Sequence, residues 1–320
     1  MNTSKIFSKK ILRIDPVHPL LDSLLRTNGW TVDEDLNGDY KHIAEKIASY
    51  QGLILRSRIP VDKFLIDRAK QLKFIARVGS GTEGIDKTYA AFKNIVVINA
   101  PEGNRNAVAE HALWLLLGLI RKSFAFAMDV KNGNWNRNAF LGNELEGKVV
   151  GIIGYGNTGQ AFAEKLSVFG CEVICHDIIP GKGDRFARQT HPEEIFQRAD
   201  IISLHVPLTP KTHHMVNARF VEKMKKNFYL INTARGETVE TESLLHFLDK
   251  GKILGAALDV IEYEHHSFNE GLKQGNFPDT LQRLLNRPNI IITPHIAGLS
   301  EESARKLAKI TADKILNLKF

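Results

Sequence analysis

One stretch, Gly147–Asp177, constrains the fold of this chain more than any other. It begins with Val149–Ile153, where β-branched residues and a glycine form the kind of apolar run that is typical of a strand buried in a parallel sheet. A glycine-rich turn follows at Gly154–Gly159, and we expect it to open a helix. A second β-branched run, Val173–Cys175, ends just before Asp177. The stretch predicts a strand–turn–helix–strand unit, the building block of a doubly wound α/β fold.

The glycines of that turn meet the physical requirements of a dinucleotide site. Gly154 makes the tight turn, Gly156 lets the backbone approach a pyrophosphate, and Gly159 lets the helix pack closely on the strand. The helix N-terminus presents N–H groups and a positive dipole to the phosphates. Asp177 lies 18 residues beyond Gly159, where a carboxylate accepts a hydrogen bond from the ribose 2′-hydroxyl and repels a 2′-phosphate. These features predict NAD rather than NADP, with an empty Rossmann-like unit as the alternative.

The composition is that of an ordinary globular protein, and the length suggests two domains. Hydrophobic residues make up 43% and charged residues 25% of the 320 residues. The longest apolar block, Ala112–Ile120, is too short to span a bilayer, and the first residues lack the apolar region and cleavage site of a signal peptide. We therefore expect a cytoplasmic protein that contacts no membrane.

The charge pattern argues against a nucleic-acid partner. The net charge is +7, but the Lys and Arg residues are scattered and do not cluster with aromatic residues. Solvated faces and some attraction for anionic substrates account for it. Cys171 and Cys175 lack metal-ligand spacing, and His213–His214 and His265–His266 are interpreted as surface pairs. We predict no metal site.

Residues 1–100 alternate strand-like and helix-like segments, which predicts a first α/β domain with a parallel sheet. The expected strands are Ile11–Ile14, Leu53–Leu55, Phe74–Arg77 and Val96–Ile98. The expected helices are Leu20–Thr27, Tyr40–Ser49, Val61–Lys70 and Lys87–Phe92. The segment Asn99–Asn104 breaks this pattern and is interpreted as a hinge.

The rest of the chain predicts a second domain of six strands. A long helix is expected over Ala107–Asn132, and its apolar first half indicates either a core helix or an oligomer interface. His265–Pro288 is a polar insert, and the amphipathic tail Ser300–Phe320 is expected to cross back and close the first domain. The remaining expected strands are Ala199–Val206, Phe228–Asn232, Leu254–Val260 and Ile290–Thr293. The expected helices between them are Pro192–Arg198, Asn217–Lys223 and Glu240–Lys250.

Polar residues follow the apolar strands of this second domain within one to three positions, where ligands bind to an open parallel sheet. They are Gly154, Asp177, His205, Asn232–Arg235, Asp259 and His295. Because the carboxyl ends of parallel strands meet at one edge, this convergence predicts an enzyme.

Three of the side chains suit the chemistry of a hydroxy acid. His295 can take a proton from an alcohol and return it to a carbonyl. A carboxylate beside it would fix its tautomer, and Glu264 is the candidate, although sequence spacing leaves Glu262 open. Arg235 offers a rigid fork that matches a carboxylate. Hydride transfer would belong to the cofactor.

Five motifs together resemble the D-2-hydroxyacid dehydrogenase family over nearly the whole chain. Besides the glycine-rich turn, they are Val78–Asp86, His205–Thr209, Asn232–Gly236, Ala257–Val260 with Glu264, and Pro294–His295. The resemblance implies a Rossmann NAD-binding domain over 101–295. It also implies a flavodoxin-like, parallel-sheet substrate domain over 1–100, completed by the helix 296–320. A homodimer that uses the long helix and Trp135 is implied too.

The resemblance also assigns site residues. Arg235 would bind the substrate carboxylate, Glu264 would partner the acid/base His295, and Asp259 would hold the nicotinamide amide. The other implied NAD-binding residues are Gly154, Tyr155, Gly156, Asn157, Thr158, Gly159, Asp177, His205, Val206, Pro207, Thr212, Thr233, Ala234, Ala297 and Gly298. The implied substrate-binding residues are Arg56, Ser57, Arg58, Val78, Gly79, Ser80, Gly81 and Asn104.

Within the family, Leu55–Arg58 and Asn99–Asn104 look most like short D-3-phosphoglycerate dehydrogenases of serine biosynthesis. Arg58 would supply a second cation for a phosphate. A glyoxylate or hydroxypyruvate reductase is the alternative within the family. A non-catalytic, NAD-sensing protein of the corepressor type is the alternative outside enzymology.

Overall fold

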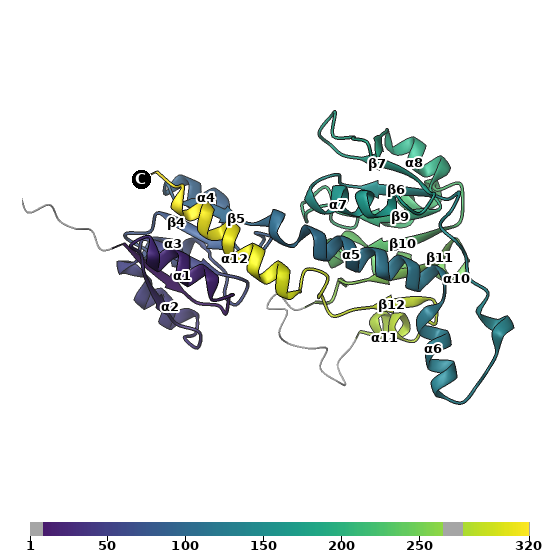
Figure 1. Ribbon diagram of the computed structural model, residues 1–320, viewed down its shortest axis with the longest axis horizontal. Coiled ribbons are helices and arrows are strands. Elements are labelled where there is room, and N and C mark those ends of the chain that lie inside the picture. The colour runs from purple at the N-terminus through teal and green to yellow at the C-terminus, as the bar shows by residue number, and fades with distance from the viewer. Residues whose placement is uncertain (1–8, 265–277, 320) are drawn as a thin grey trace, which may run out of the picture. The chain divides into compact units, whose positions relative to one another are not determined.

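The computed structural model describes residues 9–264 and 278–319, which divide into two compact units (Figure 1). The first unit comprises residues 9–104 and 299–319, and the second comprises residues 105–264 and 278–298. Helix α5 (Pro101–Ile120) runs from the first unit into the second. The segment interpreted as a hinge, Asn99–Asn104, contains the start of α5, because proline suits the first turn of a helix.

The first unit is built on a five-stranded parallel sheet in the order β2-β1-β3-β4-β5, the flavodoxin-like order expected. Its strands are β1 (Lys10–Arg13), β2 (Thr31–Glu34), β3 (Gly52–Leu55), β4 (Phe74–Arg77) and β5 (Val96–Asn99). Its first helices are α1 (Leu20–Thr27), α2 (Tyr40–Lys46), α3 (Lys63–Arg68) and α4 (Lys87–Phe92). Aspartates 39, 62 and 86 accept from the backbone N–H three residues on, which fixes where α2, α3 and α4 begin.

The C-terminal helix α12 (Glu301–Leu316) belongs to the first unit and packs along α1 (yellow against purple in Figure 1). Its buried stripe, which includes Leu307 and Ile315, shares a core cluster with Leu21 and Leu25 of α1. Ser300 starts the helix with a capping box. The amphipathic spacing of the tail thus corresponds to a face buried on the first sheet.

The second unit contains a seven-stranded parallel sheet in the order β12-β11-β10-β9-β6-β7-β8. The order reverses beside β6, so the sheet is doubly wound, as expected, and the reversal marks the place where such folds bind a dinucleotide. Its strands are β6 (Val149–Ile153), β7 (Glu172–His176), β8 (Arg188–Gln189), β9 (Ile201–Leu204), β10 (Phe228–Asn232), β11 (Ile253–Leu258) and β12 (Ile290–Ile292). Besides α5, its helices are α6 (Ser123–Lys131), α7 (Asn157–Leu166), α8 (Pro192–Arg198), α9 (Ala218–Lys223), α10 (Thr241–Asp249) and α11 (Asp279–Leu285).

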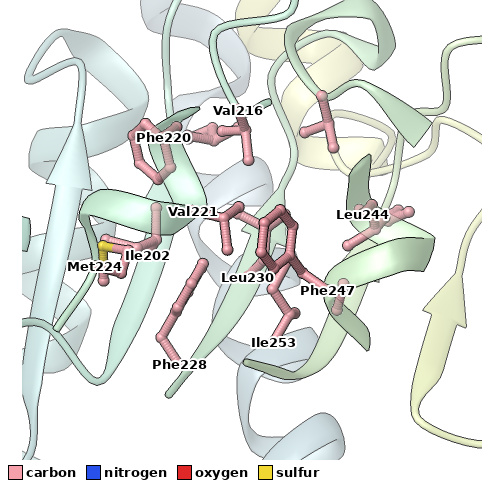
Figure 2. Packing of buried hydrophobic residues seen from close by; sticks show 14 of the residues in the cluster. Ile202, Val216, Phe220, Val221, Met224, Phe228, Leu230, Leu244, Phe247 and Ile253 are labelled. Carbon is pink, nitrogen blue, oxygen red and sulfur yellow. The ribbon is translucent and has the colours of Figure 1, made fainter. Parts of the chain in front are cut away.

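One face of this sheet forms a core with α9 and α10 (Figure 2). Phe228 and Leu230 of β10 are fully buried there, with Val221 of α9 and Leu244 of α10 packed over them. Helices on both faces leave no solvent-facing side on the central strands, which explains their continuous apolar runs. The strand ends that carry the site are therefore held by a rigid core.

The long helix expected over Ala107–Asn132 is wrong. The structure has two helices, α5 and α6 (Ser123–Lys131), because Lys122 adopts a left-handed conformation with φ of 56° between them. No glycine or proline marks this break. Helix α6 buries none of its residues within the second unit. Of the insert expected at His265–Pro288, residues 265–277 lie outside the described part, and α11 occupies most of the remainder.

Candidate active site

The turn after β6 has the shape of a pyrophosphate cradle. Gly154 has φ of 91°, a conformation that other L-residues rarely adopt, and a Cβ there would collide with the carbonyl of His205. A Cβ on Gly159 would overlap the carbonyl oxygen of Gly154, so α7 lies close to the turn. A Cβ on Gly156, which caps α7, would meet no atom within 4 Å among the described residues. The start of α7 thus leaves room beside Gly156 for a ligand.

Asp177 follows β7 and is fastened to this turn. Its Oδ2 accepts from the backbone N–H of Tyr155 at 2.8 Å, and its Oδ1 accepts from that of Ile179 at 2.9 Å. The buried Tyr155 hydroxyl donates to Asp184 at 2.7 Å. Each carboxylate oxygen has two lone pairs, so Asp177 keeps acceptor capacity for ribose hydroxyls at the end of the strand that borders the turn.

The neighbouring strand ends add further polar groups. His205 follows β9, and its ring contacts Ser203 Oγ at 2.9 Å and Thr158 Oγ1 at 3.2 Å. Burial lowers the pKa of His205 to about 3, so the ring is neutral at pH 7. Thr212 Oγ1 donates to the carbonyl of Pro207 at 2.6 Å and so folds the loop that carries Val206.

Thr233, directly after β10, has a buried Oγ1 without a hydrogen-bond partner in the described part of the chain. Its neighbour Ala234 is fixed by Asn232, whose Oδ1 accepts from the Ala234 N–H at 3.0 Å. A buried hydroxyl without a partner is costly and indicates a ligand that supplies one. Together with the open space at Gly156 and the placement of Asp177, it shows that these residues fit a dinucleotide.

His295 and Glu264 are brought together at the carboxyl end of the sheet. His295 Nδ1 lies 2.6 Å from Glu264 Oε2, and Glu264 Oε1 accepts from the backbone N–H of Ile261 at 2.5 Å. The open choice between the two glutamates is thus decided in favour of Glu264. His295 has φ of 54°, a strained conformation for a residue with a Cβ. The strain indicates that the surrounding turn fixes the direction of the ring.

The buried Asp259 accepts several hydrogen bonds from that turn. The side chain is 1% exposed, and it accepts from Thr293 Oγ1 at 2.6 Å and from the backbone N–H groups of Ile296 and Ala297 at 2.9 and 2.8 Å. Burial alone would raise the pKa of Asp259, but these bonds and His111 lower it below the ordinary value, so it is ionised at pH 7. Asp259 thus stabilises the turn that presents His295.

His111 of α5 also contacts this turn, and no sequence motif points to it. Its Nε2 lies 3.0 Å from Thr293 Oγ1 and 3.4 Å from Asp259 Oδ1. Since the Thr293 hydroxyl donates to Asp259, it accepts from His111, which places a proton on Nε2 of His111. Its position as a lone histidine in an apolar helix is the one sequence feature that could have suggested a role, but spacing does not reveal a partner 182 positions away.

Arg235 follows β10 in an extended conformation, and its Nη1 donates to the carbonyl of Ala234 at 2.6 Å. Gly236 comes next, and a Cβ there would overlap the backbone carbonyl of Ile261. The segment that carries Arg235 therefore lies directly against the one that carries Glu264. The second unit alone brings together the expected catalytic residues.

The expected substrate-binding residues all belong to the first unit. The backbone N–H groups of Arg56, Ser57 and Arg58 converge on the buried carboxylate of Asp15 at 2.5, 3.1 and 3.4 Å. The Arg58 guanidinium donates to the carbonyls of Ile14 (2.8 Å), Asp35 (2.8 Å) and Gly38. Because this side chain is occupied within its own domain, the geometry argues against the phosphate contact expected for Arg58.

Arg56 is different: its side chain is exposed and forms no ion pair within residues 9–264 and 278–319. The loop Val78–Gly81 follows β4 and is tied to the start of α5. Ser80 Oγ donates to Asn104 Oδ1 at 2.6 Å, and the Gly79 carbonyl accepts from the Ala100 N–H at 2.9 Å. Arg56 is thus an exposed cation that directly follows β3.

A doubly wound nucleotide domain with a glutamate-paired histidine and an arginine at its strand ends defines an NAD-dependent oxidoreductase that acts on an alcohol or its ketone. The chain belongs to the family described as D-isomer specific 2-hydroxyacid dehydrogenase, NAD binding domain, whose sequence profile matches residues 113–297. NAD is its cofactor.

Relatives with different substrates resemble the chain to a similar degree. It is 35% identical to a hydroxypyruvate reductase of Thermotoga maritima over 82% of this chain and 83% of that one. It is also 35% identical to a D-3-phosphoglycerate dehydrogenase of Methanocaldococcus jannaschii, over 96% of this chain but only 56% of that enzyme. A crystal structure of D-lactate dehydrogenase from Aquifex aeolicus with NAD and lactic acid superposes with a TM-score of 0.83 at 28% identity, covering 96% and 94%.

None of the described helices is long and apolar enough to cross a membrane.

Replacing Asp177 by alanine is expected to weaken NAD binding about tenfold or more and to narrow the preference for NAD over NADP. The variant loses a charged acceptor for the ribose, whose bonds contribute about 1.5–3 kcal/mol each, and loses the repulsion of a 2′-phosphate. Titration of both dinucleotides checks this, with Glu222→Ala, which removes an exposed carboxylate from α9, as the control. An unchanged NAD/NADP ratio would mean that another group selects the ribose.

Proposed function

We propose that this protein oxidises D-3-phosphoglycerate to 3-phosphohydroxypyruvate, and that Arg235, Glu264 and His295 carry the reaction. The observation behind these roles is the 2.6 Å contact between His295 Nδ1 and Glu264 on the strand ends that also carry Arg235 and the nucleotide turn. NAD, when bound, accepts the hydride that leaves C2 of the substrate.

The protein's own residues handle charge and the proton. Arg235 binds the substrate carboxylate through its planar fork and so orients C2. Glu264 contacts Nδ1 of His295, which assigns the proton transfer to Nε2. As the C2–H bond breaks, the hydroxyl proton passes to Nε2 and the C–O bond becomes a carbonyl. Glu264 stabilises the imidazolium that results, and the reverse sequence reduces a 2-keto acid.

Two observations support the phosphorylated substrate. Curated relatives named D-3-phosphoglycerate dehydrogenase match 96–97% of this chain at 33–35% identity in two archaea. Arg56 supplies an exposed cation at the end of β3 for the phosphate. The product would then enter serine biosynthesis.

Reduction of hydroxypyruvate or glyoxylate is the second candidate. The relative from Thermotoga maritima, a hydroxypyruvate reductase, is matched over most of its own length. The occupied guanidinium of Arg58 also leaves fewer cations for a phosphate than the sequence analysis expects. The catalytic roles stay the same in this case.

The substrate is tested by measuring NADH formation with 3-phosphoglycerate and NADH oxidation with hydroxypyruvate and glyoxylate. We expect kcat/KM to favour the phosphorylated acid, and Arg56→Gln to raise its KM about tenfold because a charged hydrogen bond is lost. Lys70→Gln, which removes an exposed charge elsewhere in the first unit, serves as the control. A preference for the small keto acids, unaffected by Arg56→Gln, would overturn the phosphoglycerate proposal and favour the second candidate.

We further propose a homodimer formed through the second unit. Helix α6 exposes Phe124, Phe126, Met128 and Val130 by 39–55%, and Trp135 is 81% exposed. A helix with several exposed apolar side chains and no residue buried in its own unit is typical of a protein interface. Sedimentation equilibrium should give twice the chain mass, and Phe126→Asp should shift it towards a monomer.

A further inference from the structure

Two glutamates follow β11, two positions apart, and only one of them faces His295. The other, Glu262, points to a different set of groups. Its Oε2 accepts from the backbone N–H of Thr241 at 3.0 Å and from Thr241 Oγ1 at 2.7 Å, and its Oε1 contacts His214 Nε2 at 2.6 Å. Burial would raise the pKa of Glu262, but Thr241 and His214 lower it, so the carboxylate is charged at pH 7.

The contact with Thr241 gives α10 a cap that its own sequence does not supply. Thr241 is the first residue of α10, and the N-cap residue Glu240 makes no capping hydrogen bond with its side chain. A carboxylate at a helix N-terminus satisfies an unpaired N–H and interacts favourably with the helix dipole. Glu262 thus binds the segment that follows Arg235 from a separate strand end.

His214 connects a third segment, the loop after β9. Its backbone N–H donates to the carbonyl of Glu237 at 2.7 Å, and the next strand-like contact joins Val216 to Val239. His214 has φ of 49°, a conformation that needs support from its surroundings, and its ring bonds to Glu262. His214, interpreted from the sequence as part of a surface pair, is partly exposed and also contacts Glu262.

The segments of Arg235 and Glu264 are pressed together at Gly236, whose Cα side lies against the Ile261 carbonyl. Before this point the two segments leave paired strands, and the Asp259 N–H donates to the Asn232 carbonyl at 2.9 Å. Both contacts lie on one side of the short helix Gly236–Thr238, and the bonds of Glu262 to Thr241 add a contact on its far side. The contact of Glu262 therefore restrains the end of the Arg235 segment that the strand pairing does not reach.

We propose that Glu262 is a positioning residue, which holds the segment of Arg235 at a fixed spacing and orientation from the segment of Glu264 and His295. This inference rests on the proposed function of that site. Glu262 touches none of the three proposed catalytic side chains in the described structure. Its effect comes through geometry, because a displacement of about 1 Å between substrate-binding and acid/base groups costs up to about 100-fold in rate.

The first test is Glu262→Gln, which keeps the size of the side chain but turns one acceptor into a donor. One of the donors, Thr241 N–H or His214, then faces an N–H group. We expect about a tenfold fall in kcat and about a tenfold rise in KM for the 2-keto acid that the wild type reduces best, measured at saturating NADH. The Kd of NADH, followed by its fluorescence, should stay within threefold, since Glu262 contacts Thr241, beyond Gly236, whereas the nucleotide turn and Thr233 lie at the ends of β6, β7 and β10.

A matched pair at His214 tests the same link from its other end. His214→Leu removes the donor and should reproduce the kcat and KM changes of Glu262→Gln. His214→Gln, whose amide nitrogen reaches about as far as Nε2, should keep both constants near wild type. If His214 served only general stability, the loss in His214→Leu would extend to NADH binding. Recovery of kcat and KM in His214→Gln, with the Kd of NADH unchanged throughout, therefore indicates positioning. If Glu262→Gln fails to fold, this pair carries the test.

The outcomes separate this inference from the proposed function. If Glu264→Gln loses activity while Glu262→Gln and His214→Leu keep wild-type kcat and KM, the positioning role is wrong and the proposed function stands. If the variants lose NADH affinity along with kcat, the role is structural and the inference is likewise overturned. If the wild type turns over none of the three acids tested, the proposed function itself fails.

Discussion

Replacing His295 by asparagine is expected to lower kcat about 100-fold to 10,000-fold, with the Kd of NADH nearly unchanged. The variant lacks a group that can exchange a proton with the substrate oxygen, and general acid–base catalysis contributes factors of this size. Asparagine is chosen because it tolerates the left-handed conformation, with φ of 54°, that His295 adopts. Steady-state kinetics and NADH fluorescence titration of the same preparation check both parts.

The control for this variant is His246→Ala, which removes an exposed histidine from α10 of the same unit. It should leave kcat unchanged. Loss of turnover with intact NADH binding would also exclude the hypothesis that the protein is a non-catalytic NAD sensor, because such a sensor needs no acid/base residue. Substantial turnover by the His295 variant would mean that another residue moves the proton, and the assignment of His295 would be wrong.

Replacing Arg235 by glutamine is expected to lower kcat/KM for the 2-keto acid by about 100-fold or more. A guanidinium forms two parallel bonds with a carboxylate, each charge-assisted and contributing about 1.5–3 kcal/mol. Most of the loss should appear in KM, because the carboxylate is bound in the ground state as well as in the transition state. Initial rates over a range of keto-acid concentrations at saturating NADH measure the division.

Arg235→Lys is the informative companion variant, since it keeps the charge but loses the planar fork. We expect it to lie between the wild type and Arg235→Gln. If the lysine and glutamine variants are equally impaired, geometry outweighs charge at this position. If neither changes KM, the carboxylate is held elsewhere, and the exposed Arg56 becomes the first alternative.

Much of the fold follows from the sequence because the parallel strands are buried on both faces. Strands such as β6 and β10 read as uninterrupted apolar runs, and their ends locate the polar residues. The edge strand β2 is missed, since only Val32 of its four residues is buried and a polar run resembles a loop. The break between α5 and α6 is missed because a lysine, rather than glycine, takes the left-handed conformation.

The site is less predictable than the fold, because it depends on contacts between loops. Strand-end reasoning places Gly154, Asp177 and His295 at one edge, but it does not tell Glu262 from Glu264. Both follow the same strand within six positions, and only the folded loop shows which carboxylate meets which histidine. The occupied guanidinium of Arg58 is likewise invisible to motif matching, since its acceptors are backbone carbonyls of Ile14, Asp35 and Gly38.

The attachment of Asp177 to the glycine turn bears on any redesign of this protein for NADP. A substitution that only makes room for the extra phosphate also removes the acceptor of the Tyr155 N–H and so loosens the loop that must grip both dinucleotides. A cofactor switch built at this position needs a side chain that still accepts from that N–H, such as asparagine, with a cation introduced at a neighbouring position. Recognition of the ribose and rigidity of the glycine turn thus depend on the same side chain, and a redesign has to preserve both.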